Sequence, residues 1–69
     1  MFENLIQLIN GTTIIVNDKE FKRVLRSYKR VFSFSNFLTI LDIQGHLFTI
    51  KKENVLFFED YNGQKIKKT

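Results

Sequence analysis

The stretch N-D-K-E-F-K-R-V-L-R-S-Y-K-R-V-F, residues 17–32, decides how the rest of the chain is interpreted. At about 100° per residue its apolar side chains gather in one arc of a helix, whereas a strand would mix basic and apolar residues on each face. Asn17, followed three residues later by Glu20, matches a capping box. The sequence therefore predicts an amphipathic helix over residues 18–31, with an apolar arc that covers a sheet and comprises Phe21, Val24, Leu25, Tyr28, Val31 and Phe32.

Two β-rich runs precede this helix. The segment L-I-Q-L-I-N-G-T-T-I-I-V, residues 5–16, has Asn10-Gly11 at its centre, the dipeptide best suited to a two-residue turn. That turn pairs Ile9 with Thr12. Leu5, Ile9, Ile14 and Val16 then share one face, and the other face carries Ile6, Leu8 and Ile15. A hairpin that is apolar on both faces is expected in the middle of its sheet or under a partner.

Strand patterns return after the helix, in residues 37–43, 46–51, 55–60 and 64–68. Gln44-Gly45 and Asn62-Gly63 each predict a further two-residue turn, which places Leu41 opposite Phe48 and Asp60 opposite Lys65. The order of elements is ββαβββ(β). The sequence predicts a single α+β domain over residues 1–69, in which a small, mostly antiparallel sheet or a curled small barrel carries one amphipathic helix.

The length of the chain limits its stability. A chain of 69 residues buries only about 60% of the surface that its unfolded form exposes, and such chains often add a disulfide, a metal or a partner subunit. There is no cysteine and only one histidine, which excludes a disulfide and argues against a four-ligand zinc site. Idealised packing and self-association are the two remaining ways to gain stability, and of these we expect self-association as a homodimer.

The ends and the composition of the chain favour a location in the cytoplasm. No apolar run approaches the roughly 18 residues of a membrane-spanning helix. Residues 1–4 contain no basic segment ahead of an apolar stretch, so a secretory signal is not expected. The lack of cysteine fits a reducing compartment. We expect a cytoplasmic protein without membrane attachment.

Residues suited to catalysis are few. His46 stands beside Gly45 in an expected turn, with no thiol to partner it. The adjacent acids Glu59 and Asp60 point to opposite faces of a strand, so they cannot easily share a proton or a metal. The three glycines are isolated, so no phosphate-binding loop is present. We expect neither an enzyme nor a cofactor.

The polar side of the predicted helix is strongly basic. Six of the eleven cationic residues lie on it: Lys19, Lys22, Arg23, Arg26, Lys29 and Arg30. One interpretation is a plain solvated face, because lysine and arginine are good helix formers. The other is contact with a polyanion, favoured because Glu20 is the only acid placed to pair with these cations on the helix. The hypothesis preferred from the sequence is a small regulatory protein that contacts DNA or RNA through Lys22, Arg23, Arg26, Lys29 and Arg30.

Residues 30–37, R-V-F-S-F-S-N-F, have a basic and aromatic spacing similar to the ribonucleoprotein-1 signature of RNA-recognition motifs. They depart from that signature at Val31, Ser33 and Ser35, and the order of elements also differs from that family. Phe32 belongs to the apolar arc of the helix. Because aromatic side chains mainly fill cores, we expect Phe32, Phe34 and Phe37 to be core residues and not base-stacking ones.

A second sequence similarity lies within the predicted helix. The stretch F-K-R-V-L-R-S-Y, residues 21–28, is similar to the F-x-R-V-H-R-S-Y stretch of LytTR-type DNA-binding domains, with Leu25 in place of the histidine. The similarity covers eight residues of a chain shorter than those domains. It implies DNA contact by Arg23 and Arg26, and it assigns no family.

A protein-interaction module is the alternative function. Phe57 and Phe58 are consecutive, so they point to opposite faces of a strand and only one of them enters the core. An exposed phenylalanine and a hairpin apolar on both faces would together form an adhesive patch. In this alternative, Ile15, Phe57 and Phe58 bind a larger intracellular protein for which the chain is an adaptor or inhibitor.

Overall fold

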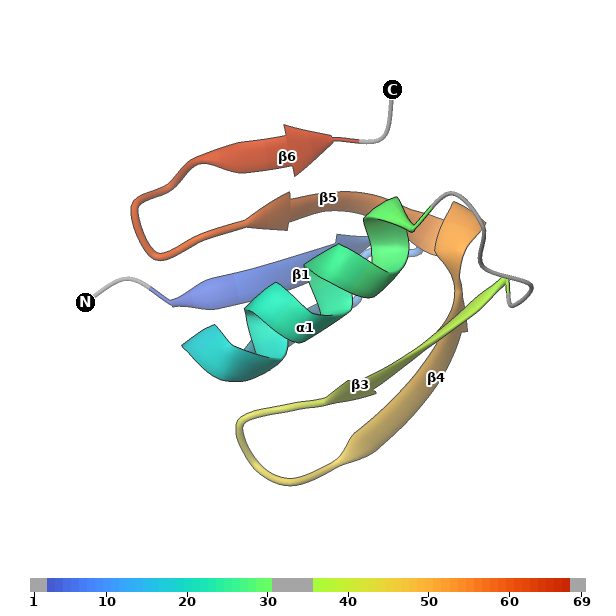
Figure 1. The fold of residues 1–69 in the computed structure, drawn as a ribbon, viewed down its shortest axis with the longest axis horizontal. Coiled ribbons are helices and arrows are strands. Elements are labelled where there is room, and N and C mark those ends of the chain that lie inside the picture. The colour runs from blue at the N-terminus through green and yellow to red at the C-terminus, as the bar shows by residue number, and fades with distance from the viewer. Residues whose placement is uncertain (1–2, 31–35, 68–69) are drawn as a thin grey trace.

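The computed structural model describes residues 3–30 and 36–67. Within these residues the fold is α+β, in the predicted order (Figure 1). The elements are β1 (Asn4–Leu8), β2 (Thr13–Val16), α1 (Asp18–Lys29), β3 (Phe37–Leu41), β4 (Leu47–Lys51), a 3₁₀ turn η1 (Lys52–Asn54), β5 (Val55–Glu59) and β6 (Lys65–Lys67). No helix in this part of the chain is long and apolar enough to cross a membrane.

The described strands form two antiparallel sheets. One has the order β2-β1-β5-β6, and the other is the β3–β4 hairpin. Ile43 N donates to Ile15 O over 2.8 Å, and this bond ties the loop of the hairpin to strand β2. Helix α1 lies across β1 on one side and contacts β3 on the other (Figure 1). The helix is therefore held between the two sheets, with its outer side exposed.

The core lies beneath α1, as the helical periodicity predicts. Phe21 and Val24 are buried, and Leu25 and Tyr28 pack partly buried against the same cluster. Residues 31 and 32 of the expected arc lie outside the described residues. The strands contribute the other buried apolar side chains: Ile6, Leu8, Ile14, Val16, Leu38, Ile40, Val55 and Phe58.

All three hairpins have three-residue loops, so the two-residue turns predicted from sequence are wrong. In the first, Leu8 N donates to Thr12 O over 2.8 Å, and Gly11 N donates to Leu8 O over 3.1 Å. In the second hairpin Asp42 N donates to His46 O and Gly45 N donates to Asp42 O, and in the third Asp60 N donates to Gln64 O and Gly63 N donates to Asp60 O. Each loop ends in a glycine at positive φ, between 82° and 94°. A left-handed residue at the end of a three-residue loop is a common hairpin solution, and glycine adopts it without strain.

The longer loops change which side chains are buried. Ile6 now lies opposite Ile14, and both are buried together with Leu8 and Val16. The prediction had placed Ile6 and Leu8 on the opposite face from Ile14. A shift of one residue in register moves every side chain of one strand to the other face of the sheet, which accounts for the error.

The second and third hairpins show the same shift. Leu41 lies opposite Leu47 instead of Phe48, and Ile43 is 59% exposed in the loop. In the third hairpin Glu59, and not Asp60, lies opposite Lys65, with 3.9 Å between the carboxylate and the ammonium group.

Tyr28 is a polar residue in an apolar setting. Its ring lies 5.0 Å from that of Phe58, centroid to centroid, at an angle of 60°. Its hydroxyl is buried and has no hydrogen-bond partner in the part of the chain that the structure describes. Burial raises the pKa of this hydroxyl. The hydroxyl contributes a desolvation cost without a compensating bond.

We therefore expect Tyr28→Phe to raise the free energy of unfolding, by about 1 kcal/mol, because the substitution removes the unpaired group and keeps the ring. Urea denaturation followed by circular dichroism measures this change. Tyr61→Phe, at an exposed loop residue, is the matched control and should leave stability unchanged. A loss of stability in Tyr28→Phe would show that the hydroxyl has a partner.

Candidate nucleic-acid interface

Local interactions fix where α1 begins. Asn17 caps the helix, because its side-chain oxygen accepts the backbone N–H of Glu20 over 2.8 Å. This confirms one half of the predicted capping box. Asp18, in the first turn, accepts a 2.5 Å hydrogen bond from the side chain of Asn4, a buried residue of β1. The start of the helix is thus anchored to the sheet, and this anchor sets the direction in which the basic side points.

The helix ends earlier than predicted, at Lys29 instead of residue 31. Arg30 is the C-cap: its backbone is extended, and its N–H donates to Ser27 O over 3.3 Å. Arg26 and Lys29 lie in the last turn, where cations interact favourably with the helix dipole. The placement of charge along the helix therefore stabilises α1, independently of any ligand.

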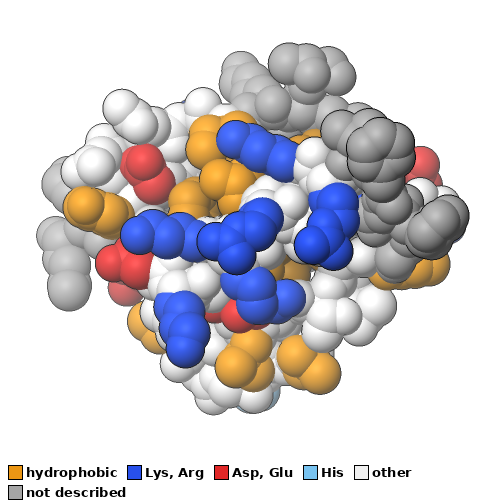
Figure 2. All heavy atoms as spheres, in the orientation of Figure 1, with side chains coloured by type: hydrophobic (Ala, Val, Ile, Leu, Met, Phe, Trp, Pro, Cys, Tyr) orange, Lys and Arg blue, Asp and Glu red, His pale blue; other side chains and the backbone are white. Residues whose placement is uncertain are grey.

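Most of the predicted cationic residues are exposed and unpaired. Lys22, Arg26, Lys29 and Arg30 have exposed side chains, and none forms an ion pair within residues 3–30 and 36–67. Figure 2 shows lysine and arginine side chains gathered over α1, with little acidic surface among them. We call these four residues the cationic face.

Arg23 is different from its neighbours, because it is bound within the protein. Its Nε and Nη2 donate to the two carboxylate oxygens of Glu20 over 2.8 and 2.6 Å. The same Nη2 donates to Thr39 O over 2.6 Å, and Glu20 Oε2 accepts the N–H of Leu41 over 2.8 Å. The pair thus satisfies two backbone groups on the edge of β3. Arg23 thus joins the helix to the second sheet, unlike the other predicted contact residues.

The charges of this pair stabilise each other. The hydrogen bonds from Arg23 lower the pKa of Glu20, against a smaller opposing effect of burial, and the Leu41 N–H adds to the lowering. The hydrogen bonds to Glu20 raise the pKa of the Arg23 guanidinium. Glu20 is therefore held ionised and neutralises Arg23. Because Glu20 is used in this pair, it does not neutralise the four residues of the cationic face. The i,i+3 spacing of the two residues is visible in the sequence, but their contact with β3 is not.

A hollow lies beside the cationic face, between α1 and β3. Its volume is about 470 Å³, and it is lined by Asn17, Lys19, Glu20, Lys22, Arg23, Arg26 and Leu41. Leu41 is 44% exposed and provides apolar surface there. Basic side chains thus surround the apolar side chain of Leu41 in this hollow. This combination is suited to an anionic ligand that also has an apolar part.

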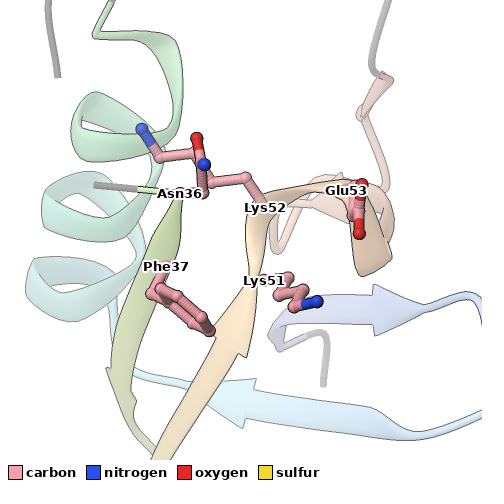
Figure 3. A pocket seen from close by; sticks show the side chains of 5 residues that line it. All are labelled: Asn36, Phe37, Lys51, Lys52 and Glu53. Carbon is pink, nitrogen blue, oxygen red and sulfur yellow. The ribbon is translucent and has the colours of Figure 1, made fainter. Parts of the chain in front are cut away.

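The predicted core position of Phe37 is wrong. Phe37 is 50% exposed on the outer side of β3, because β3 buries only the alternate residues Leu38 and Ile40. With Asn36, Lys51, Lys52 and Glu53 it lines a second hollow of about 510 Å³ (Figure 3). Phe32 and Phe34 lie outside the described residues.

The residues of the alternative interaction surface are separated by the fold. Phe58 is completely buried, so of the two consecutive phenylalanines it is the one that enters the core. Ile15 and Phe57 are half-buried on the outer side of the four-stranded sheet, but they are not cross-strand neighbours: Ile15 pairs with Leu5 and Phe57 with Gln7. The three side chains do not form one patch.

His46 takes part in the turn between β3 and β4. Asp42 accepts the backbone N–H groups of Gln44 and His46 over 2.9 and 2.7 Å, and its carboxylate lies 3.4 Å from His46 Nδ1. Although burial alone would raise the pKa of Asp42, these hydrogen bonds lower it. Among the described residues, no three His, Cys, Asp or Glu side chains are grouped to hold a metal ion. The described arrangement is suited to closing a loop.

Comparison with known proteins yields no relative from which a function could be transferred. No family model, no curated protein and no solved structure matches the chain.

Proposed function

We propose that this protein is a small, non-enzymatic regulatory protein that binds nucleic acid through the cationic face of α1. The observation that carries the proposal is that Lys22, Arg26, Lys29 and Arg30 are exposed on one side of a rigidly anchored helix, with no carboxylate paired to them in the described chain. Like charges within a turn of each other repel, and phosphates relieve that repulsion.

The four residues have a different role from Arg23. They are the phosphate-binding groups, because their charged ends are free to reach a ligand. Arg23 is a positioning residue, because it holds α1 against β3 through Glu20 and Thr39. Phosphate contacts set orientation and affinity without reading bases, so we expect little sequence preference.

The test is a titration of the purified protein with mixed-sequence duplex and single-stranded oligonucleotides, starting at about 50 mM salt. For four neutralised phosphates we expect a slope of log K against log salt of about −3.6 on duplex DNA and about −2.8 on a single strand. The absence of binding to either oligonucleotide at low salt would overturn the proposal.

A pair of charge-matched variants separates this face from general basicity. Lys22→Gln with Arg26→Gln should weaken binding at least tenfold and make the duplex slope less steep by about 1.8, because two phosphate contacts are removed. The control is Lys52→Gln with Lys65→Gln, which removes the same charge from η1 and strand β6. Equal weakening in both variants would mean that net charge, and not the helix, attracts the nucleic acid.

A further inference from the structure

The free edges of the two sheets differ in how they are protected. The outer edge of β3 is satisfied by α1, because Arg23 donates to Thr39 O and Glu20 accepts from Leu41 N. The edge of β2 is engaged in part by the bond from Ile43 N to Ile15 O. Strand β6 is only three residues long and has the sequence K-I-K, and short length and lysine both discourage edge pairing.

Strand β4 lacks such protection. The bonds from Asp42 N to His46 O and from Lys52 N to Asn36 O show which cross-strand pairs of the β3–β4 ladder are hydrogen-bonded. In an antiparallel ladder, hydrogen-bonded and non-hydrogen-bonded pairs alternate. The pairs 38/50 and 40/48 are therefore the bonded ones, and the N–H and C=O groups of Leu47, Thr49 and Lys51 point away from β3. These three residues are exposed, and their outward backbone groups have no partner in the described chain.

A hollow lies beside part of this edge. Thr49, Ile50 and Lys51 line a hollow of about 420 Å³, with the β1–β2 loop and η1 on its other side. Leu47, at the opposite end of β4, is 67% exposed. The Leu47 end of the edge is therefore exposed, whereas the Lys51 end borders the hollow.

The inner side of the hairpin is also incompletely covered. Leu38 and Ile40 on β3 are 2% and 0% exposed, whereas their cross-strand neighbours Ile50 and Phe48 on β4 are only partly buried. The core thus extends to β4 and stops there, with apolar side chains left at its margin. An additional strand with apolar residues on the same side would complete it.

We propose that β4 is the interface of a homodimer, in which β4 pairs antiparallel with β4 of a second copy and Thr49 lies at the two-fold axis. A second copy fits this edge, because the strand is complementary to itself. With Thr49 opposite the partner's Thr49, Leu47 lies opposite the partner's Lys51, so each residue with outward backbone groups meets another such residue. Each of these facing pairs can exchange two hydrogen bonds.

The side chains match in the same register. On the inner side Phe48 lies opposite the partner's Ile50, which joins the two cores in one apolar row that continues to Ile40 and to the partner's Leu38. On the outer side Leu47 lies against the aliphatic stem of the partner's Lys51. The result is a continuous four-stranded sheet made from two hairpins, an isologous interface of the kind that closed dimers use. This proposal does not depend on nucleic-acid binding.

The lack of native cysteine allows a direct test. In the proposed register the two residues at position 49 form a hydrogen-bonded pair with Cα atoms about 5.5 Å apart, within the range that a disulfide can span. Thr49→Cys should therefore form a covalent dimer under mild oxidation. Lys51→Cys is the matched control on the same strand: its two copies are offset by four residues, roughly 13 Å along the strand, and should not be linked.

The mass in solution gives a second readout. Light scattering should report twice the chain mass of 8.2 kDa for the natural protein. Thr49→Asp should return it to the monomer mass with an unchanged circular dichroism spectrum, because two carboxylates would meet at the axis. A monomer at all concentrations, a dimer that survives Thr49→Asp, or equal cross-linking of both cysteine variants would overturn the proposal. A monomer that binds an added extended peptide along β4 would do so as well.

Discussion

Phe58→Ala should lower the free energy of unfolding by roughly 3–5 kcal/mol, the range measured when buried phenylalanines are truncated to alanine. The side chain is 0% exposed at the centre of the core. Its ring makes edge-on contacts with Phe21, at 6.0 Å, and with Tyr28, at 5.0 Å, between centroids. Removing it leaves a cavity between α1 and β5 that these neighbours cannot fill without moving the helix.

The consequence of such a loss is large for a chain of this size. Small domains are stable by only about 5–15 kcal/mol, and a 69-residue chain belongs toward the lower end. Urea denaturation followed by circular dichroism measures the change. We expect the variant to unfold at a much lower urea concentration, or to be largely unfolded in buffer.

Phe57 provides the matched control, because it is the same residue type one position earlier on the same strand. It lies half-buried on the outer side of the sheet, with Lys65 Nζ 4.8 Å from its ring centroid. Phe57→Ala leaves no internal cavity and should cost about 1–2 kcal/mol, for lost area and the cation–π contact. Similar losses in the two variants would contradict the register described for β5.

Glu20→Ala should lower the free energy of unfolding by about 2 kcal/mol, although Glu20 is a polar residue on a surface helix. Its carboxylate accepts hydrogen bonds from the Arg23 guanidinium and from Leu41 N. Without it, Arg23 loses its counter-charge and the edge of β3 loses one of its two bonds to α1. Glu53→Ala, at an exposed acid of η1, is the control and should change stability by less than about 0.5 kcal/mol.

The pair also predicts how stability depends on pH. The pKa of Glu20 is lowered in the folded protein, so the folded state binds this proton less readily than the unfolded chain does. The stabilisation is therefore fully present above the ordinary pKa of 4.5 and is lost as the pH falls below it toward the lowered folded pKa. Glu20→Gln should remove this part of the acid-side loss.

A double-mutant cycle with Arg23 tests the assignment itself. If the two residues act as one unit, Glu20→Gln in an Arg23→Gln background should cost little beyond the single substitution. Additive losses would show that the contacts of Glu20 and Arg23 stabilise the fold separately. Arg23→Gln, assayed for nucleic-acid binding, should retain the salt slope of the natural protein, because Arg23 is not one of the proposed phosphate-binding groups.

Much of the candidate interface could be predicted, because it lies on a helix. The periodicity of residues 17–32 separated a basic side from an apolar side, and Lys22, Arg26, Lys29 and Arg30 are exposed as expected. Arg23 could not be separated from them by periodicity. Its role depends on Thr39, sixteen residues away, which the fold brings within 2.6 Å.

The sequence by itself determined the α+β class, the order of elements, and the two sides of α1. These follow from contacts between residues at most four apart, and such contacts are visible in the spacing of side chains. Only the tertiary structure decided the register of the hairpins, the burial of Phe58, the exposure of Phe37 and the bond from Arg23 to β3. Each of these features depends on a loop that is one residue longer than the local dipeptide suggests, or on contacts between segments distant in the chain. Such features are not visible locally, because a strand has no stable pairing until the rest of the fold supplies one.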